Sequence, residues 1–295
     1  ENPYDFLTSW AQQLKNPLNA IDNVKIHVVD NLFGYEGVSG AWTWIDMGNY
    51  YAPGAYGISV FDNTYHLYFD TTRPNAPPKI LGTKPTIEGL SFTNYLTLNN
   101  TGRDNGYIYG APFSYSRVLR GNIPAGRNNF SIKGDIPDPG LLLGQLLASE
   151  LNKRAIRTTT IETAQQQFVE SINAPYSHRV GKKLFSHYSP SLTKILREVN
   201  VESNNHFAEH LIRTIGRKQN TNIYMDALDE GVKYINTHWT KRSIATSSLF
   251  LYDGSGLAPQ NAASAEFITN LLLHMYKRRN YSREFYDTLP IAGKD

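Results

Sequence analysis

The chain has 295 residues, no cysteine, and 29 Lys and Arg residues against 26 Asp and Glu residues, giving a formal net charge of +3. A chain of this length can bury a large core without a metal or disulfides. The lack of cysteine excludes a thiolate nucleophile and favours a periplasmic or extracellular location. The basic residues are scattered, which argues against nucleic acid as a partner. The longest apolar runs, such as LLLGQLL at 141–147, are too short for a membrane span, so we expect none.

Residues 24 to about 135 have the pattern of an all-β module. VKIHVV at 24–29 predicts a strand, and ISVFDNTYHLYFD at 58–70 predicts a hairpin around an Asp62-Asn63 turn. Further short aromatic segments follow, separated by Gly, Asn, Asp and Pro clusters that favour turns. They are SFTNYLTL at 91–98, GYIYG at 106–110, FSYSRVL at 113–119 and NNFSIKG at 128–134.

After PDPG at 137–140 the apolar spacing changes to that of helices. Leucines from 142 to 151 predict the first helix, and helices dominate from about 180 onward. One stripe consists of Leu192, Ile195, Leu196 and Val199, and a second of Phe207, Leu211, Ile212 and Ile215. The second helix begins at or just after Ser203, and Gly216 is expected to end it. Two more helices are expected at about 222–236 and 264–277, so the chain as a whole is α+β.

Two active-site signatures overlap in VESNNHFAEHLIRTIG at 201–216. His206, Glu209 and His210 form His-x-x-Glu-His, in which two histidines on one helix face bind zinc and the glutamate acts as a general base. A third protein ligand is needed, and no downstream carboxylate lies in a paired-Glu helix that would indicate one. Zinc chemistry is therefore the less favoured interpretation, and the histidines are expected to flank the apolar stripe.

Ser203 and Asn205 form the other signature, Ser-x-Asn. In active-serine penicillin-interacting enzymes, this tripeptide lies in a turn between two helices, where the Ser hydroxyl relays a proton and the Asn amide holds a substrate carbonyl. The structural alternative is an ordinary helix N-cap, which satisfies free N–H groups at the helix start. The two roles do not exclude one another.

Four longer segments, in order, resemble one family. They are AWTWIDMGNYYAP at 41–53, GNIPAG with PDPG at 121–126 and 137–140, SPSLTKILREVNVESNNHFAEHLIR at 189–213, and YDGSGLAPQNAAS at 252–264 followed by LPIAG at 289–293. The chain thereby resembles the D-alanyl-D-alanine carboxypeptidase and endopeptidase family of class C penicillin-binding proteins, the penicillin-binding protein 4 type. The resemblance implies part of a transpeptidase-like (serine beta-lactamase-like) domain with a β-rich accessory insert. Residues 1–175 would be the insert region, in one or two subdomains, and 176–295 the helical C-terminal part of the transpeptidase-like domain.

The resemblance also implies a function. The family cleaves peptidoglycan peptide stems through a serine acyl-enzyme, needs no metal or cofactor, and binds beta-lactams when complete. Ser203 and Asn205 would then be catalytic residues, and Glu209 would not act as a general base beside a metal ion.

The sequence departs from the family pattern at the other two parts of its site. The only Ser-x-x-Lys is Ser191 to Lys194, which we interpret as a helix start because it lies one short helix ahead of Ser203; there is no Lys-Thr-Gly. We therefore expect an incomplete portion of a longer enzyme, inactive by itself. The alternative is a pseudoenzyme that only binds peptidoglycan.

Two further groups of residues invite a functional interpretation. Ser255 lies in Asp-Gly-Ser-Gly, which lacks the full Gly-x-Ser-x-Gly nucleophile pattern and is expected to be a structural turn. The aromatic residues Trp42, Trp44, Tyr50 and Tyr51 would be the wall-binding surface of a pseudoenzyme. Packing beneath the insert is the favoured alternative for these four side chains.

Overall fold

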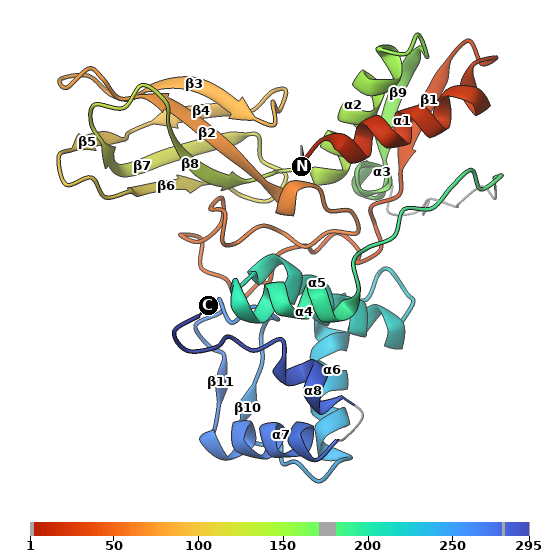
Figure 1. Ribbon diagram of the computed structural model, residues 1–295, viewed down its shortest axis with the longest axis vertical. Coiled ribbons are helices and arrows are strands. Elements are labelled where there is room, and N and C mark those ends of the chain that lie inside the picture. Colours follow the sequence, from red (N-terminus) through yellow and green to blue (C-terminus); the bar gives the residue numbers. More distant parts are fainter. Residues whose placement is uncertain (1–2, 171–180, 279–280, 295) are drawn as a thin grey trace.

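The computed structural model describes residues 3–170, 181–278 and 281–294, and its elements gather into three groups (Figure 1). The first group is a small α/β unit near the N-terminus. It consists of α1 (Asp5–Leu18), β1 (Val24–Val28), α2 (Pro139–Asn152), β9 (Thr158–Thr163) and α3 (Ala164–Glu170). Strands β1 and β9 pair in parallel although more than a hundred residues separate them, and α2 lies against both. The strand predicted at 24–29 is therefore present but lies outside the β-rich part.

The second group is the β-rich part, in which two sheets enclose a core. Its strands are β2 (Thr64–Asp70), β3 (Lys79–Lys84), β4 (Ser91–Asn94), β5 (Thr97–Asn99), β6 (Asn105–Tyr109), β7 (Ser116–Pro124) and β8 (Phe130–Asp135). One sheet has the order β3-β2-β8 and the other β4-β7-β5, with β6 also paired to β7. Tyr65, Leu67 and Phe69 alternate along β2 and are fully buried, as the period of two predicts. All four short aromatic segments contain strands.

The predicted hairpin at 58–70 is wrong in its first half. Residues 58–60 form no strand, and the 3₁₀ turn η1 (Phe61–Asn63) directly precedes β2. All three residues of η1 have positive φ, and the Asn63 side chain accepts a hydrogen bond from the Val60 N–H at 3.0 Å. β2 pairs instead with β3 and β8, because this turn redirects the chain and does not fold it back on itself.

Residues 29–60 form a long irregular segment, called here the 29–60 loop. Its backbone makes a single β-bridge, between Asn49 and Gly134 of β8. Polar bonds tie this loop to the C-terminal part: Trp42 Nε1 donates to Asp253 Oδ2 at 2.9 Å, and Ser39 Oγ donates to the Tyr252 carbonyl at 2.7 Å. The prediction of an all-β module over 24–135 is therefore wrong for residues 29–60, which form no strand and are held by side-chain hydrogen bonds.

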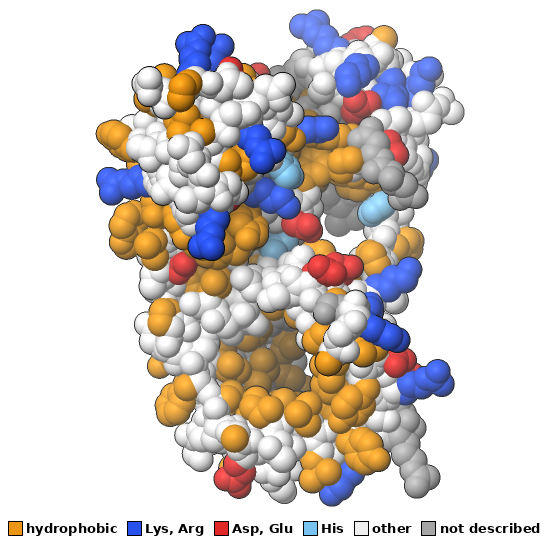
Figure 2. Space-filling model, turned by 60° about the vertical axis from the view of Figure 1, so that its left-hand side comes forward, with side chains coloured by type: hydrophobic (Ala, Val, Ile, Leu, Met, Phe, Trp, Pro, Cys, Tyr) orange, Lys and Arg blue, Asp and Glu red, His pale blue; other side chains and the backbone are white. Residues whose placement is uncertain are grey.

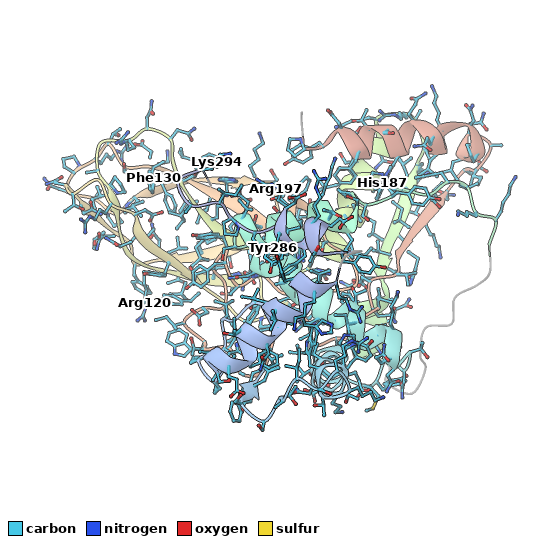
Figure 3. The ribbon with its side chains drawn as sticks, turned by 60° about the horizontal axis from the view of Figure 1, so that its bottom comes forward. Arg120, Phe130, His187, Arg197, Tyr286 and Lys294 are labelled. Atoms are coloured by element: carbon cyan, nitrogen blue, oxygen red, sulfur yellow. The ribbon has the colours of Figure 1, made fainter. Side chains whose placement is uncertain are left out.

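The third group is helical. It contains α4 (Leu192–Val201), α5 (Asn205–Gln219), α6 (Ala227–Thr240), the two-stranded pair β10 (Leu249–Phe250) and β11 (Ala262–Ala263), α7 (Ala265–Lys277) and α8 (Ser282–Tyr286). Figure 3 shows Arg197 of α4 and Tyr286 of α8 at the centre of this part, with Phe130 on the β-rich side and His187 on the opposite side. Arg197 Nη1 donates to the Asp287 carbonyl at 3.1 Å, which joins the end of α8 to α4.

The prediction that Gly216 ends α5 is wrong, because the helix continues to Gln219. Gly216 instead lets α6 approach: a β-carbon there would overlap the Ala227 carbonyl oxygen, and one at Gly231 would overlap the Ile212 carbonyl oxygen. A close helix–helix contact, and not a helix end, is the reason for this glycine.

The expected apolar stripes are also only partly correct. No residue of α4 is buried, and Leu192 is 60% exposed. On α5 the buried face contains Ile212 but is otherwise His206, Glu209, Arg213, Gly216 and Arg217. Figure 2 shows a hollow lined by hydrophobic side chains in the helical half of the molecule. The proposed boundary between residues 1–175 and 176–295 falls within 171–180, outside the described residues, and stays a prediction.

Candidate functional site

Ser203 lies in the turn between α4 and α5, with its side chain exposed. The N-cap of α5 is Asn204, whose Oδ1 accepts a hydrogen bond from the Phe207 N–H at 3.0 Å. The Ser203 backbone has a φ of 53°, and its hydroxyl bonds to no other described residue. The capping role expected for Ser203 therefore belongs to Asn204, and the Ser203 hydroxyl is left available.

Asn205 is held in place by the 29–60 loop. Its Nδ2 donates to the Tyr51 carbonyl at 2.8 Å. A primary amide has two N–H donors and one acceptor oxygen, so this bond fixes the side chain and leaves one donor and the oxygen for a ligand. Ser203 and Asn205 therefore present a hydroxyl and an amide from the same turn.

Both residues line a cavity of about 410 Å³ between the β-rich part and the helices. The walls come from the 29–60 loop, η1, β2, β8, the end of α4 and the start of α5. The lining residues are Tyr50, Tyr51, Pro53, Asp62, Thr64, Lys133, Glu198, Glu202, Ser203, Asn204, Asn205 and His206. A larger cavity of about 800 Å³ beside α2 and β9 contains none of the predicted motif residues.

Charged groups of both signs face the cavity at the Ser203 turn. Glu198, Glu202 and Asp62 contribute carboxylates, and Lys133 of β8 contributes an ammonium group. Burial raises the pKa of Asp62, and Lys133 opposes that rise. A cavity with this charge pattern suits a peptide that carries both ammonium and carboxylate groups.

His206 and His210 converge beside this cavity. Their Nε2 atoms lie 3.0 Å apart, and Ser59 Oγ lies 3.2 Å from the first and 2.7 Å from the second. Burial lowers the pKa of His206 well below its usual value and that of His210 to about 3, and Arg213 acts in the same direction on both. The histidines are therefore neutral and hydrogen-bonded, and the expectation that they are a polar flank is wrong because His206 is buried.

Glu209 is not available as a general base. Its Oε1 accepts hydrogen bonds from the N–H groups of Gly254 and Ser255, each at 2.8 Å, and its Oε2 is paired with Arg213. The side chain is completely buried. Among the described residues no group of three or more His, Cys, Asp or Glu side chains could hold a metal ion. The geometry thus argues against the zinc peptidase and makes Glu209 a link between α5 and the turn at 253–256.

The two other candidate serines have structural roles. Ser191 is the N-cap of α4, and its Oγ accepts a hydrogen bond from the Lys194 N–H at 3.4 Å. Ser255 belongs to a turn closed by Asp253, in which Gly256 has a φ of 83°. Both structural predictions are confirmed.

The four aromatic residues of the predicted wall-binding surface separate into two kinds. Trp42 is 7% exposed and packs with Ala52 and Ala258. Trp44 and Tyr50 are 65% and 54% exposed, and Tyr51 is intermediate. The surface interpretation is therefore wrong for Trp42, whose indole N–H is used by Asp253.

A family model described as D-Ala-D-Ala carboxypeptidase 3 (S13) matches residues 5–295. The chain belongs to this family. Among curated relatives, a D-alanyl-D-alanine carboxypeptidase of Actinomadura sp. (strain R39) is 23% identical over 253 residues, which are 82% of this chain and 45% of the relative's length. The D-alanyl-D-alanine carboxypeptidase DacB of Haemophilus influenzae is 26% identical over 150 residues, which are 50% of this chain and 29% of the relative's length.

Solved structures show the same fold. The crystal structure of penicillin binding protein 4 from Haemophilus influenzae has a TM-score of 0.75 at 18% identity, covering 98% of this chain and 61% of its own. The same protein complexed with a beta-lactam has a TM-score of 0.70 at 16% identity, covering 99% and 60%. The predicted family and the α+β transpeptidase-like fold are confirmed. The chain spans less than two thirds of the length of these relatives and solved structures.

Sequence reasoning did not find Asp62, Lys133 or the Ser59–histidine cluster. Asp62 and Lys133 reach the Ser203 turn from separate strands and turns, so no local spacing connects them. Only the His206 and His210 pair had a local signal, and its geometry differs from the metal site that the spacing suggested.

Proposed function

We propose that the protein hydrolyses the peptide stems of bacterial peptidoglycan through a serine acyl-enzyme, as a carboxypeptidase on terminal D-Ala-D-Ala or an endopeptidase on cross-links. One observation carries this proposal. The Ser203 hydroxyl, which bonds to no described residue, and the anchored Asn205 amide line one cavity that also carries carboxylates and an ammonium group. Membership of the S13 family supports the reaction class.

The chemistry assigned to these residues follows from their groups. A nucleophilic serine oxygen forms a bond to the scissile carbonyl carbon while its proton passes to a base, and the carbon–nitrogen bond then breaks. Ser203 donates a proton to the leaving amine and regains one from the base, while Asn205 donates to a substrate carbonyl. Water then cleaves the ester. A hydroxyl with no competing partner is free to act as this relay.

We assign the nucleophile to a Ser-x-x-Lys segment other than residues 191–194, because neither Ser191 nor Lys194 lines the Ser203 cavity. We therefore propose that residues 1–295 by themselves form no acyl-enzyme. We further propose that the complete protein binds beta-lactams, as penicillin binding protein 4 of Haemophilus influenzae does in its complex.

A periplasmic or extracellular location is proposed with this function, and the absence of cysteine fits it. None of the helices in the described part of the chain has the length and apolar character needed to span a membrane.

Labelling with fluorescent penicillin tests the proposal on the product of the whole gene and on residues 1–295. We expect the whole product to be labelled and residues 1–295 not to be. Ser203→Ala should slow labelling of the whole product by about a hundred- to ten-thousandfold, since that is the usual contribution of general acid–base assistance. Ser191→Ala is the matched control and should label normally.

Two outcomes would contradict the proposal. Full-rate labelling of the Ser203→Ala variant would remove Ser203 from the mechanism. A whole gene product that takes no label but still binds sacculi would favour the pseudoenzyme.

A further inference from the structure

Three aromatic side chains form a connected row, called here the aromatic strip: Trp44 and Tyr107 are exposed, and Tyr109 between them is half-buried. The rings of Trp44 and Tyr109 have centroids 5.1 Å apart, and those of Tyr109 and Tyr107 are stacked at 6.2 Å with planes 19° apart. Trp44 is 65% exposed and Tyr107 is 41% exposed. The row therefore presents extended aromatic area to solvent.

The strip is assembled from two distant segments. Tyr107 and Tyr109 occupy alternate positions of β6 and face outward, while Ile108 between them is fully buried. Trp44 comes from the 29–60 loop. Isolated exposed aromatics are common on protein surfaces, but three that contact one another across separate segments need a reason.

A basic group continues the strip. Arg120 of β7 lies opposite Tyr107 in the strand pairing, so the two side chains share a face of the sheet. Its guanidinium lies 6.0 Å from the ring centroid of Tyr95. Figure 3 labels Arg120 at the outer edge of the β-rich part, away from Arg197 and Tyr286. Figure 2 shows hydrophobic side chains with basic ones beside them on the face that includes this part.

One strip residue pair lies near the wall of the Ser203 cavity. Tyr50 and Tyr51 line that cavity, with ring centroids 5.5 Å apart. The Tyr51 hydroxyl donates to Asp46 Oδ1 at 3.2 Å. Burial is the main cause that raises the pKa of Tyr51, followed by Asp46, and Tyr107 and Tyr109 add to the rise, so these two strip residues lie close to Tyr51.

We propose that the aromatic strip binds the polysaccharide strand of the cell wall, while a peptide stem attached to that strand enters the Ser203 cavity. Pyranose rings have flat faces of C–H groups that pack on aromatic rings, and their hydroxyl and amide groups hydrogen-bond to phenols and guanidinium groups. Trp and Tyr combine an apolar body with a polar tip, which suits such a ligand. This inference rests on the proposed function, because that function places the stem in the cavity.

The test measures binding of two probes to the protein: soluble glycan strands stripped of their peptide stems, and a free pentapeptide stem. The double variant Trp44→Ala/Tyr107→Ala should lose affinity for stripped strands by about tenfold or more, because it removes the two exposed rings on which the sugar faces would pack. Its affinity for the free stem should not change. Trp44→Phe/Tyr107→Phe should keep most of the strand affinity.

Tyr188→Ala is the control for loss of an exposed ring, since Tyr188 is 81% exposed and lies far along the chain from the strip. Circular dichroism checks that each variant is folded, and the single variant Trp44→Ala replaces the double variant if the latter unfolds. Equal strand affinity in the wild type and the alanine variants, or none in the wild type, would overturn the inference. If the wild-type protein binds stripped strands but not the free stem, or if the whole gene product takes no penicillin label, that result would count against the proposed function alone.

Discussion

Ser203 occupies the left-handed region of backbone conformation, with a φ of 53°. That region costs an L-residue about 1–2 kcal/mol relative to the usual one, and glycine avoids the cost. Strain of this kind persists where the surroundings impose it, and it is frequent at functional sites. Here Asn204 caps α5 and Asn205 is bonded to Tyr51, so the two following residues hold Ser203 in place.

Replacing Ser203 with glycine should separate stability from function. Ser203→Gly relieves the strained backbone, and we expect the free energy of unfolding to rise by up to about 1 kcal/mol. Penicillin labelling of the whole gene product should slow as it does in Ser203→Ala. Urea denaturation and labelling rates measure the two effects. Ser243, exposed with a φ of 59°, is the matched control: Ser243→Gly should stabilise equally and leave labelling unchanged.

Helix α5 owes its position to buried polar groups more than to its apolar stripe. Glu209 bonds to the 253–256 turn and to Arg213, and both side chains are almost fully buried. Buried charges are tolerated when they are paired, and removal of one partner leaves the other desolvated and unpaired. The ion pair is therefore essential to the way α5 presents the Ser203 turn.

Glu209→Gln should consequently lower the free energy of unfolding by about 3–5 kcal/mol, because it leaves the Arg213 guanidinium buried without a counter-charge. The measurement is equilibrium denaturation by guanidinium chloride or urea. Asp287, whose Oδ2 lies 3.8 Å from Arg283 Nε with both side chains exposed, supplies the comparison. Asp287→Asn should have little effect, since exposed ion pairs contribute little. An equally small loss for Glu209→Gln would show that the buried pair is dispensable.

Across the whole molecule, the 29–60 loop joins the β-rich part to the helices through a few bonds. Asp253 is central: besides Trp42 it accepts hydrogen bonds from the Gly256 and Ala258 N–H groups and from Asn261 Nδ2. The same loop supplies the Tyr51 carbonyl to Asn205 and the Ser59 hydroxyl to the two histidines. The candidate site therefore depends on the docking of two parts of the chain.

Asp253→Ala should weaken that docking. It leaves several buried donors unpaired, at about 1–3 kcal/mol each, so we expect a lower melting temperature and a thermal transition that divides into two. Differential scanning calorimetry measures both effects. Asp22→Ala, at an exposed position, should melt as the wild type does. A single, unshifted transition for Asp253→Ala would mean that the parts are held together in another way.

Local pattern was sufficient for much of the secondary structure. Alternating Tyr65, Leu67 and Phe69 predicted β2, and the Pro139 start and the Ser191 cap predicted α2 and α4. These features depend on residues within one turn or one strand of each other. The parallel pairing of β1 with β9, and helices α1 and α3, were not predicted. The strands and α1 depend on packing with distant segments, and the start of α3 bonds to Asp30, far away in the sequence.

By itself the sequence determined the family, through four ordered segments, and it identified Ser203 and Asn205 as the pair to examine. Tertiary structure decided between the functional and structural interpretations of the motif residues. Glu209 is buried against Arg213, and the Trp42 indole is bonded to Asp253, so both have structural roles. The Ser203 hydroxyl lies in a cavity with Lys133. The physical reason is that a motif specifies groups along the chain, whereas burial, partner and charge environment depend on segments brought together from far apart by folding.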